Sequence, residues 1–192
     1  MSSQIKLIAG LGNPGPKYEK TRHNVGFWFI DALAKSKGVN LKLESKFHGE
    51  AGKINLAGDV WLLKPNTFMN RSGQSVSAIA KYYKITPQEI LVVHDELDLV
   101  TGTAKLKENG GHAGNNGIRD IIAALGKNDF LRLRIGIGQA EKKGGTDYVL
   151  GTPAKTDREN MEKIIDEAII WLPEIAEGNV ASAMNHLHSL KY

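Results

Sequence analysis

The chain has 192 residues, of which 41% are hydrophobic and 24% charged, with 25 Lys and Arg against 21 Asp and Glu and no cysteine. A chain of this size buries about 70% of its unfolded surface, enough for one core without cross-links. The missing cysteines exclude disulfides, thiolate zinc sites and cysteine nucleophiles. The longest apolar stretch, residues 168–172, is too short to span a bilayer, and the first residues lack a charged and then apolar leader. These features predict one domain, residues 1–192, in the cytoplasm and with no membrane partner.

Apolar runs of strand length alternate along the chain with segments of helical periodicity, a pattern that predicts an α/β fold. Strands are expected at residues 5–9, 90–93, 103–107 and 131–137, and a hairpin at 47–56 and 60–64. Helices are expected over residues 25–33, 76–83, 118–125, 161–172 and 180–190, with Thr156 and Glu159 as a capping box for the fourth. Because the hairpin is inserted among strand and helix units, we expect a mixed β-sheet with helices on both faces.

The segment 10–15 matches the G-x-G-x-x-G pattern of dinucleotide-binding proteins, directly after a predicted strand. That pattern requires a helix that begins within the glycines and an acidic residue about 20 positions later, at the end of a second parallel strand. Here Pro14, Pro16 and a polar run follow, and Asp31 lies inside the first predicted helix. The glycines instead predict a tight turn that leaves Asn13 exposed at a strand end, where open α/β sheets bind ligands.

Two segments carry ionisable side chains that suit acid–base chemistry, with His23 before the first predicted helix and Asp95 at the end of an apolar strand. A lone histidine is more often a capping or surface residue than a catalyst. Asp95 and Glu96 are adjacent and point to opposite faces if the strand continues, which disfavours a metal site made from both. A single carboxylate there is better suited to orient an imidazole and raise its basicity. His186 and His188 face different sides of a predicted helix, so no metal and no cofactor are expected.

A nucleophilic serine has little support, because no G-x-S-x-G motif occurs and Ser72 is interpreted as a helix cap. A hydrolase with this sequence would have to activate water directly, using a base of near-neutral pKa and neutral amides that hold the substrate and the developing oxyanion. The asparagines near glycine turns or predicted helix starts are Asn13, Asn24, Asn70, Asn115 and Asn116. Asparagine at such places usually caps a helix or turns the chain, and that interpretation is kept for Asn24 and Asn115.

Basic side chains gather between residues 102 and 145, where the sequence has eight bases against four acids. Lys105 and Lys107 share one face of a predicted strand, and Arg132 and Arg134 share one face of another. This pattern fits protection of a sheet edge by lysine and phosphate binding about equally well. Further bases that would extend either role are Lys127, Lys142 and Lys143.

Several segments match one known family in both order and spacing. They are Gly10-Leu11-Gly12-Asn13-Pro14-Gly15, Tyr18, Thr21-Arg22-His23-Asn24, Pro65-Asn66-Thr67-Phe68-Met69-Asn70, His94-Asp95-Glu96-Leu97-Asp98, Gly110-Gly111-His112, Asn116-Gly117 and Arg132-Leu133-Arg134-Ile135-Gly136-Ile137-Gly138. Together they resemble bacterial peptidyl-tRNA hydrolase, from about Ile5 to the C-terminal helix. The resemblance implies a single α/β domain with a twisted mixed β-sheet surrounded by helices.

The resemblance also implies an activity, the hydrolysis of the ester between a peptide and the 3′-terminal ribose of tRNA, which recycles tRNA from prematurely released chains. In the family, the histidine that matches His23 is the general base and the aspartate that matches Asp95 orients it. The residues implied to bind the substrate are Asn13, Tyr18, Met69, Asn70 and Asn116. Asn115 stands where a number of family members have histidine, so no role is assigned to it.

The implied partner is peptidyl-tRNA, contacted at its acceptor stem, 3′ end and 5′ phosphate by a monomeric enzyme. Cations that match Lys107 and Arg134 are associated with the 5′ phosphate, and we add Lys105 to them. An alternative is a non-catalytic RNA-binding protein on the same scaffold. The enzyme is favoured by four intact residues, His23, Asp95, Asn13 and Asn70. A third hypothesis, a nicotinamide-dependent oxidoreductase, predicts NADH binding, which we do not expect.

Overall fold

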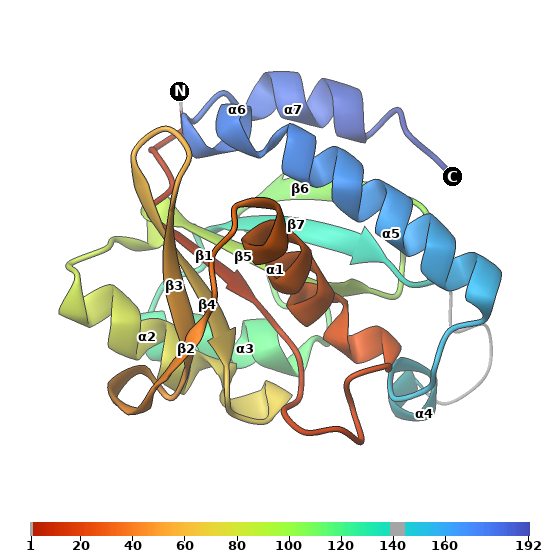
Figure 1. The fold of residues 1–192 in the computed structure, drawn as a ribbon, viewed down its shortest axis with the longest axis horizontal. Helices are drawn as coiled ribbons and strands as arrows, with labels where there is room; N and C mark the ends of the chain where they lie inside the picture. The colour runs from red at the N-terminus through yellow and green to blue at the C-terminus, as the bar shows by residue number, and fades with distance from the viewer. Residues whose placement is uncertain (1, 139–144) are drawn as a thin grey trace.

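Seven strands form one mixed sheet in the computed structural model, which describes residues 2–138 and 145–192 (Figure 1). The strands are β1 (Leu7–Gly10), β2 (Lys42–Glu44), β3 (Gly49–Asn55), β4 (Asp59–Pro65), β5 (Ile90–Glu96), β6 (Ala104–Glu108) and β7 (Leu131–Gly136). Their order across the sheet is β2-β3-β4-β1-β5-β7-β6. The central strands β4, β1, β5 and β7 run parallel, and β3 and β6 each pair antiparallel with their neighbours. The predicted mixed sheet is confirmed.

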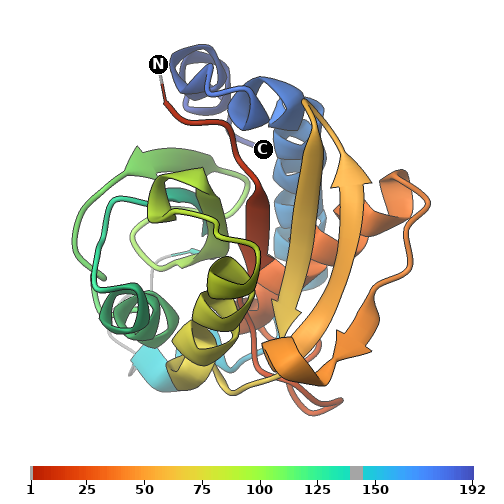
Figure 2. The same ribbon diagram turned by 90° about the vertical axis from the view of Figure 1, so that its left-hand side faces the viewer.

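Helices cover both faces of this sheet. They are α1 (Val25–Ser36), α2 (Ser72–Tyr82), α3 (Asn116–Leu125), α4 (Gly145–Val149), α5 (Lys155–Ile170), α6 (Leu172–Ala176) and α7 (Val180–Leu187), with short 3-10 turns η1 (Arg22–Asn24), η2 (Ser45–Phe47), η3 (Met69–Arg71) and η4 (Pro87–Glu89). Figure 2 shows α2 (yellow-green) and α3 (green) side by side on one face. The helices α1, α5, α6 and α7 pack on the other face.

Two apolar clusters, one on each face of the sheet, make up the core. The strand β1 is fully buried, and its alternating side chains point to opposite faces. Leu7 and Ala9 belong to the cluster that contains α2 and α3, whereas Ile8 belongs to the cluster that contains α1 and α5 to α7. This burial on both faces explains why β1 and β5 are continuous apolar runs in the sequence rather than alternating ones.

A close approach between two glycines sets the position of α1. A Cβ atom on Gly10 would lie 2.2 Å from the carbonyl oxygen of Gly26, and a Cβ atom on Gly26 would lie 2.5 Å from the carbonyl oxygen of Val93. Only glycine fits at both places, so α1 lies directly against the ends of β1 and β5. This contact brings the turn before α1, which contains His23, to the carboxyl end of β5.

The structure corrects several boundaries that the sequence predicted. The strand β5 continues to Glu96 instead of ending at residue 93, because its last residues still pair with β7. The capping box at Thr156 and Glu159 is wrong, since α5 begins at Lys155 with Ala154 at the N-cap and both residues lie inside its first turns. The short elements β2 and α4 were not predicted. In the described ranges, no helix is both long and apolar enough to cross a membrane.

Candidate active site

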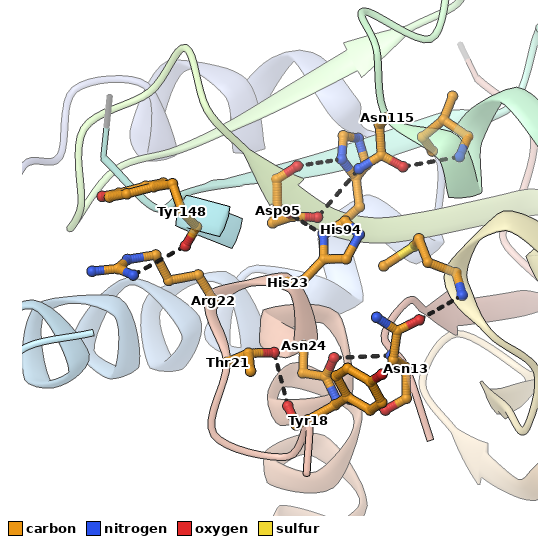
Figure 3. Close-up of polar contacts among 12 residues, drawn as sticks. Asn13, Tyr18, Thr21, Arg22, His23, Asn24, His94, Asp95, Asn115 and Tyr148 are labelled. Carbon is orange, nitrogen blue, oxygen red and sulfur yellow. Dashed lines mark hydrogen bonds and ion pairs between the residues drawn. The ribbon is translucent and has the colours of Figure 1, made fainter. Parts of the chain in front are cut away.

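The structure brings His23 and Asp95 into direct contact at the carboxyl end of β5 (Figure 3). The histidine lies in the turn η1, and the aspartate is the penultimate residue of β5. The ring Nδ1 lies 2.7 Å from the carboxylate Oδ2. The histidine side chain is 13% exposed and the aspartate side chain 3%, so the carboxylate is shielded while the ring still reaches the surface of a cavity. Because Nδ1 is engaged by the carboxylate, Nε2 is the ring atom left for a ligand.

The environment of this pair makes the imidazole more basic than a free one. Burial lowers the pKa of His23, but the charge of Asp95 and its hydrogen bond raise the pKa, and the net result lies above the usual 6.5. In the neutral form, Nδ1 donates its proton to the carboxylate and Nε2 carries the lone pair. The arrangement therefore supplies a base with its lone pair on the ring atom that is not bonded to Asp95.

Asn115 holds the other oxygen of this carboxylate. Its Nδ2 donates to Oδ1 of Asp95 at 3.2 Å, and its own Oδ1 accepts from the backbone N–H of Ile118 at 3.0 Å. The predicted helix cap is confirmed, since Asn115 is the N-cap of α3. The contact with Asp95 was missed, because the cap can be predicted from the sequence but the partner of its free amide cannot. Both carboxylate oxygens are thus fixed from two sides.

Asn13 is buried, and the prediction that it is exposed at the strand end is wrong. Only 7% of it is accessible. The side chain of Asn24 bonds the backbone of Asn13 at both ends: Asn13 N donates to Oδ1 at 2.9 Å, and Nδ2 donates to Asn13 O at 2.8 Å. Asn24 ends the turn η1 and occupies the N-cap position of α1, as interpreted, but its side chain makes no capping bond to the helix. The Oδ1 of Asn13 accepts from the backbone N–H of Met69 at 2.7 Å. Its Nδ2 is therefore the atom available to donate to a ligand.

A cavity of about 580 Å³ surrounds the His23–Asp95 pair. Besides this pair, it is lined by the predicted substrate residues Asn13, Met69, Asn70 and Asn116. Tyr18 does not line the cavity, and its ring packs edge-on against Phe68, which does, with ring centroids 6.1 Å apart. Asn13 and His23 follow β1, Met69 and Asn70 follow β4, and Asp95 lies near the end of β5. The carboxyl ends of these parallel strands form the edge where α/β sheets bind ligands.

The helix α4 forms a further wall of the cavity that the sequence did not predict. Gly145, Val149 and the adjoining Leu150 line the cavity. Arg22 fastens this wall beside η1: its guanidinium lies 4.1 Å from the centre of the Tyr148 ring and donates to the Tyr148 carbonyl at 3.1 Å. A five-residue helix carries no readable periodicity, which is why it escaped prediction.

The four strand cations do share one face, but they divide into two groups. Lys105 lies directly opposite Arg134 across β6 and β7, and Lys107 lies opposite Arg132. Arg132 is 2% exposed and donates to the carbonyls of Gly110 and Gly111 at 2.7 and 2.6 Å, so it fastens the glycine loop instead of facing a ligand. The other three are only partly buried.

Arg134 is paired with Glu96, whose carboxylate Oε1 lies 3.2 Å from its Nη1. Asp95 and Glu96 therefore point apart, as the alternation of a strand predicts, one toward the imidazole and the other toward the cations. Since β6 is the sheet edge, its lysines also fit the edge-protection interpretation. Lys142 and Lys143 lie outside the described residues.

The remaining candidate residues, Ser72, His186 and His188, form no site in the structure. Ser72 is not a cap; it is the first residue of α2, fully buried, and donates to the Met69 carbonyl at 2.7 Å. His186 faces Glu167, whereas His188 accepts from the backbone of Leu106. Residues 2–138 and 145–192 contain no cluster of three potential metal ligands. A larger hollow of about 770 Å³ lies elsewhere and is lined by none of the predicted site residues.

The fold and the cavity define a class of protein. An α/β sheet presents, at the carboxyl ends of its parallel strands, an imidazole paired with a carboxylate and surrounded by side-chain amides. This set of groups serves to activate a nucleophile and to stabilise an oxyanion, as in the hydrolysis of esters and amides. No helix begins within residues 10–15, which removes the structural basis for dinucleotide binding there.

Comparison with known proteins agrees with this class. The family model described as peptidyl-tRNA hydrolase matches residues 7–192. A peptidyl-tRNA hydrolase of Methylococcus capsulatus is 55% identical, covering 96% of this chain and 99% of that protein, and one of Coxiella burnetii is 52% identical, covering 98% and 100%. The crystal structure of peptidyl-tRNA hydrolase from Acinetobacter baumannii superposes with a TM-score of 0.94 at 47% identity, covering 100% of this chain and 98% of that one. The chain belongs to the peptidyl-tRNA hydrolase family, and the predicted family and enzyme class are confirmed.

Proposed function

We propose that this protein hydrolyses the ester that joins an N-blocked peptide to the 3′-terminal ribose of tRNA, and so recycles tRNA from prematurely released peptidyl-tRNA. The observation that carries the proposal is the 2.7 Å contact between His23 and Asp95 inside the cavity of a member of this family. The activity is assigned to one domain, residues 1–192, which acts as a monomer in the cytoplasm, where translation supplies the substrate.

His23 acts as the general base in this mechanism, and Asp95 orients it. Nε2 takes a proton from water while the water oxygen bonds to the ester carbonyl carbon. The charge of the resulting imidazolium is balanced by Asp95. When the tetrahedral intermediate collapses, the bond from the carbonyl carbon to the ribose oxygen breaks, and the imidazolium returns its proton to that oxygen. The products are a peptide with a free carboxylic acid, which loses its proton to solvent, and a tRNA with a free terminal hydroxyl group.

Side-chain amides hold the substrate and the developing oxyanion. The oxyanion accepts a hydrogen bond from Asn70 or from the loop before α3, both of which line the cavity. Asn13 donates from Nδ2, since its Oδ1 is engaged by Met69 N. Asn116 contacts the peptide from the start of α3, and Tyr18 supports Phe68 at the rim. Contacts made through amides tolerate variable peptide side chains.

Lys105, Lys107 and Arg134 bind the 5′ phosphate of the tRNA in this proposal. Lys105 and Arg134 face each other across two paired strands, which places two cations side by side on one face. The carboxylate of Glu96 restrains the guanidinium of Arg134 from the side of the catalytic strand. An arginine restrained in this way suits bidentate recognition of a phosphate.

Arg134→Ala is expected to flatten the salt dependence of tRNA binding, because one phosphate contact fewer releases fewer counterions. The slope of log Kd against log salt concentration should fall by about 0.7 to 0.9. Fluorescence anisotropy of labelled tRNA over a KCl series measures the slope. Lys53→Ala is the control, since Lys53 is an exposed residue of β3 that pairs with Asp59. An unchanged slope would mean that the strand cations do not bind phosphate and would favour the interpretation that they protect the sheet edge.

The substrate assignment is tested with two forms of one tRNA. The purified protein should rapidly release the amino acid from an N-blocked aminoacyl-tRNA and leave the unblocked form intact, because the proposed substrate carries an amide at that nitrogen. Acid precipitation of the labelled amino acid follows both reactions. Binding without cleavage of either form would favour the non-catalytic RNA-binding alternative.

A further inference from the structure

A second hollow, of about 460 Å³, adjoins the catalytic cavity. We call it the Arg71 groove, and its main lining residues are Pro14, Leu43, His48, Phe68, Arg71 and Gln74. Neighbouring residues of the same chain segments line both hollows. Asn13 faces the cavity and Pro14 the groove, Asn70 the cavity and Arg71 the groove, while Phe68 lines both. The groove is therefore a continuation of the cavity past Phe68.

The sheet order places this groove on the side away from the strand cations. The groove is lined by Leu43 of β2 and by the segment that follows β4, at one end of the sheet. The cations lie on β7 and β6 at the other end, and Asp95 lies on β5 between them. Figure 2 shows β3 and β4 (orange to yellow) well to one side of the sheet. Consider a substrate whose 5′ phosphate lies over β6 and β7 and whose ester lies at His23. Its peptide then extends from the ester in the direction of the Arg71 groove.

The spacing of the strands fixes which part of a peptide reaches the groove. The strand β4 is the second neighbour of β5, through β1, and neighbouring strands are about 4.8 Å apart, which gives a span of about 10 Å. An extended peptide rises by about 3.3 Å per residue. The residues close to the ester therefore stay within the cavity, and the fourth and fifth residues enter the groove.

The groove combines apolar surface with an uncompensated positive charge. Leu43 is 62% and Phe68 56% exposed, both large for apolar side chains. Arg71 is exposed, and among the ion pairs of the described residues none involves it. An unpaired guanidinium beside apolar side chains suits a chain that carries a carboxylate.

We propose that the Arg71 groove binds the peptide of the substrate from about its fourth residue, counted from the ester, and that Arg71 makes this enzyme prefer acidic side chains there. The proposal rests on the proposed function, because it assigns the occupant of the groove as part of the same substrate. The groove lies away from the reacting atoms, so its contribution is to binding and appears in KM.

The experiment compares pentapeptidyl-tRNAs, N-acetylated and identical except for Asp or Lys at the fourth and fifth residues from the ester. For each enzyme, kcat/KM is divided by its value for N-acetyl-aminoacyl-tRNA, so that a general loss of activity cancels. The unaltered enzyme should favour the Asp peptide by about three- to fivefold, as expected for one exposed ion pair. Arg71→Ala should remove the preference, and Arg71→Glu should reverse it.

Lys53→Glu is the matched control, because it makes the same change of charge sign on an exposed residue outside both hollows and should keep the preference for Asp. Equal use of the Asp and Lys peptides by the unaltered enzyme, or a preference that survives Arg71→Glu, would overturn the proposal. Failure to cleave even the short N-acetyl-aminoacyl-tRNA would instead refute the proposed function.

Discussion

His23→Ala is expected to lower kcat for N-blocked aminoacyl-tRNA by a factor of about 10² to 10⁴, the usual contribution of a general base. That factor corresponds to about 3 to 5 kcal/mol of activation barrier. The imidazole contacts Asp95 through Nδ1 in the cavity, and its Nε2 is free of that contact. Single-turnover hydrolysis with enzyme in excess measures the loss without interference from product release.

Affinity for tRNA and the circular dichroism spectrum should be retained in this variant, because the ring is not part of either apolar cluster. His186→Ala serves as the control, since this histidine lies on α7 and faces Glu167, away from the cavity. The control should retain full turnover. If His23→Ala also retains it, the base is a different group and the mechanism proposed above is wrong.

Asp95→Asn is expected to lower kcat by about 10² or more, although it changes only one atom of the side chain. Asn115 donates to Oδ1 of Asp95, so the amide introduced by the substitution keeps its oxygen toward Asn115 and turns its NH₂ group toward His23. A donor at that place forces Nδ1 to accept and moves the ring proton to Nε2. The lone pair that would take the proton from water is then lost.

The pH dependence gives this variant a second readout. In the unaltered enzyme, Asp95 raises the pKa of His23 by more than burial lowers it, and the neutral ring is the active form, so kcat/KM should fall as the pH drops through a pKa above 6.5. Asp95→Asn removes the raising charge and leaves the burial. The acid limb should therefore move to lower pH while the plateau is reduced. Asp31→Asn, an exposed residue of α1, is the control, and an acid limb that stays in place would mean that another group sets it.

Much of this fold can be predicted from the sequence, because its signals are local. The continuous apolar run of β5 and the stripe of α1 are visible as periodicity, and the alternation of a strand correctly separates Asp95 from Glu96. The same alternation places Lys105 and Arg134 on one face. These predictions depend only on the geometry of single elements.

The arrangement of the site could be predicted less well, because it depends on contacts between distant segments. Asn24 takes the N-cap position that the sequence suggests, yet its side chain bonds the backbone of Asn13, a residue expected to be exposed that is in fact buried. Asn115 is a cap and also holds Asp95. Arg132 and Arg134 occupy equivalent places in the alternation of β7. Only the structure shows that Arg132 bonds the neighbouring glycine loop instead of facing a ligand. A side chain with several donors and acceptors can bond many different groups, and only the tertiary structure determines which of them it meets.

His23 and Asp95 are separated by 72 positions in the sequence, and Asn115 follows Asp95 by another 20. Closing a loop of 72 residues costs an unstructured chain about 4 kcal/mol of entropy, so local contacts do not form the pair. The chain between its two members includes α1, the strands β2 to β4 and α2, so the pair depends on the assembled tertiary structure. In the proposed mechanism, a copy of this protein in which these elements are unfolded therefore has no reactive centre.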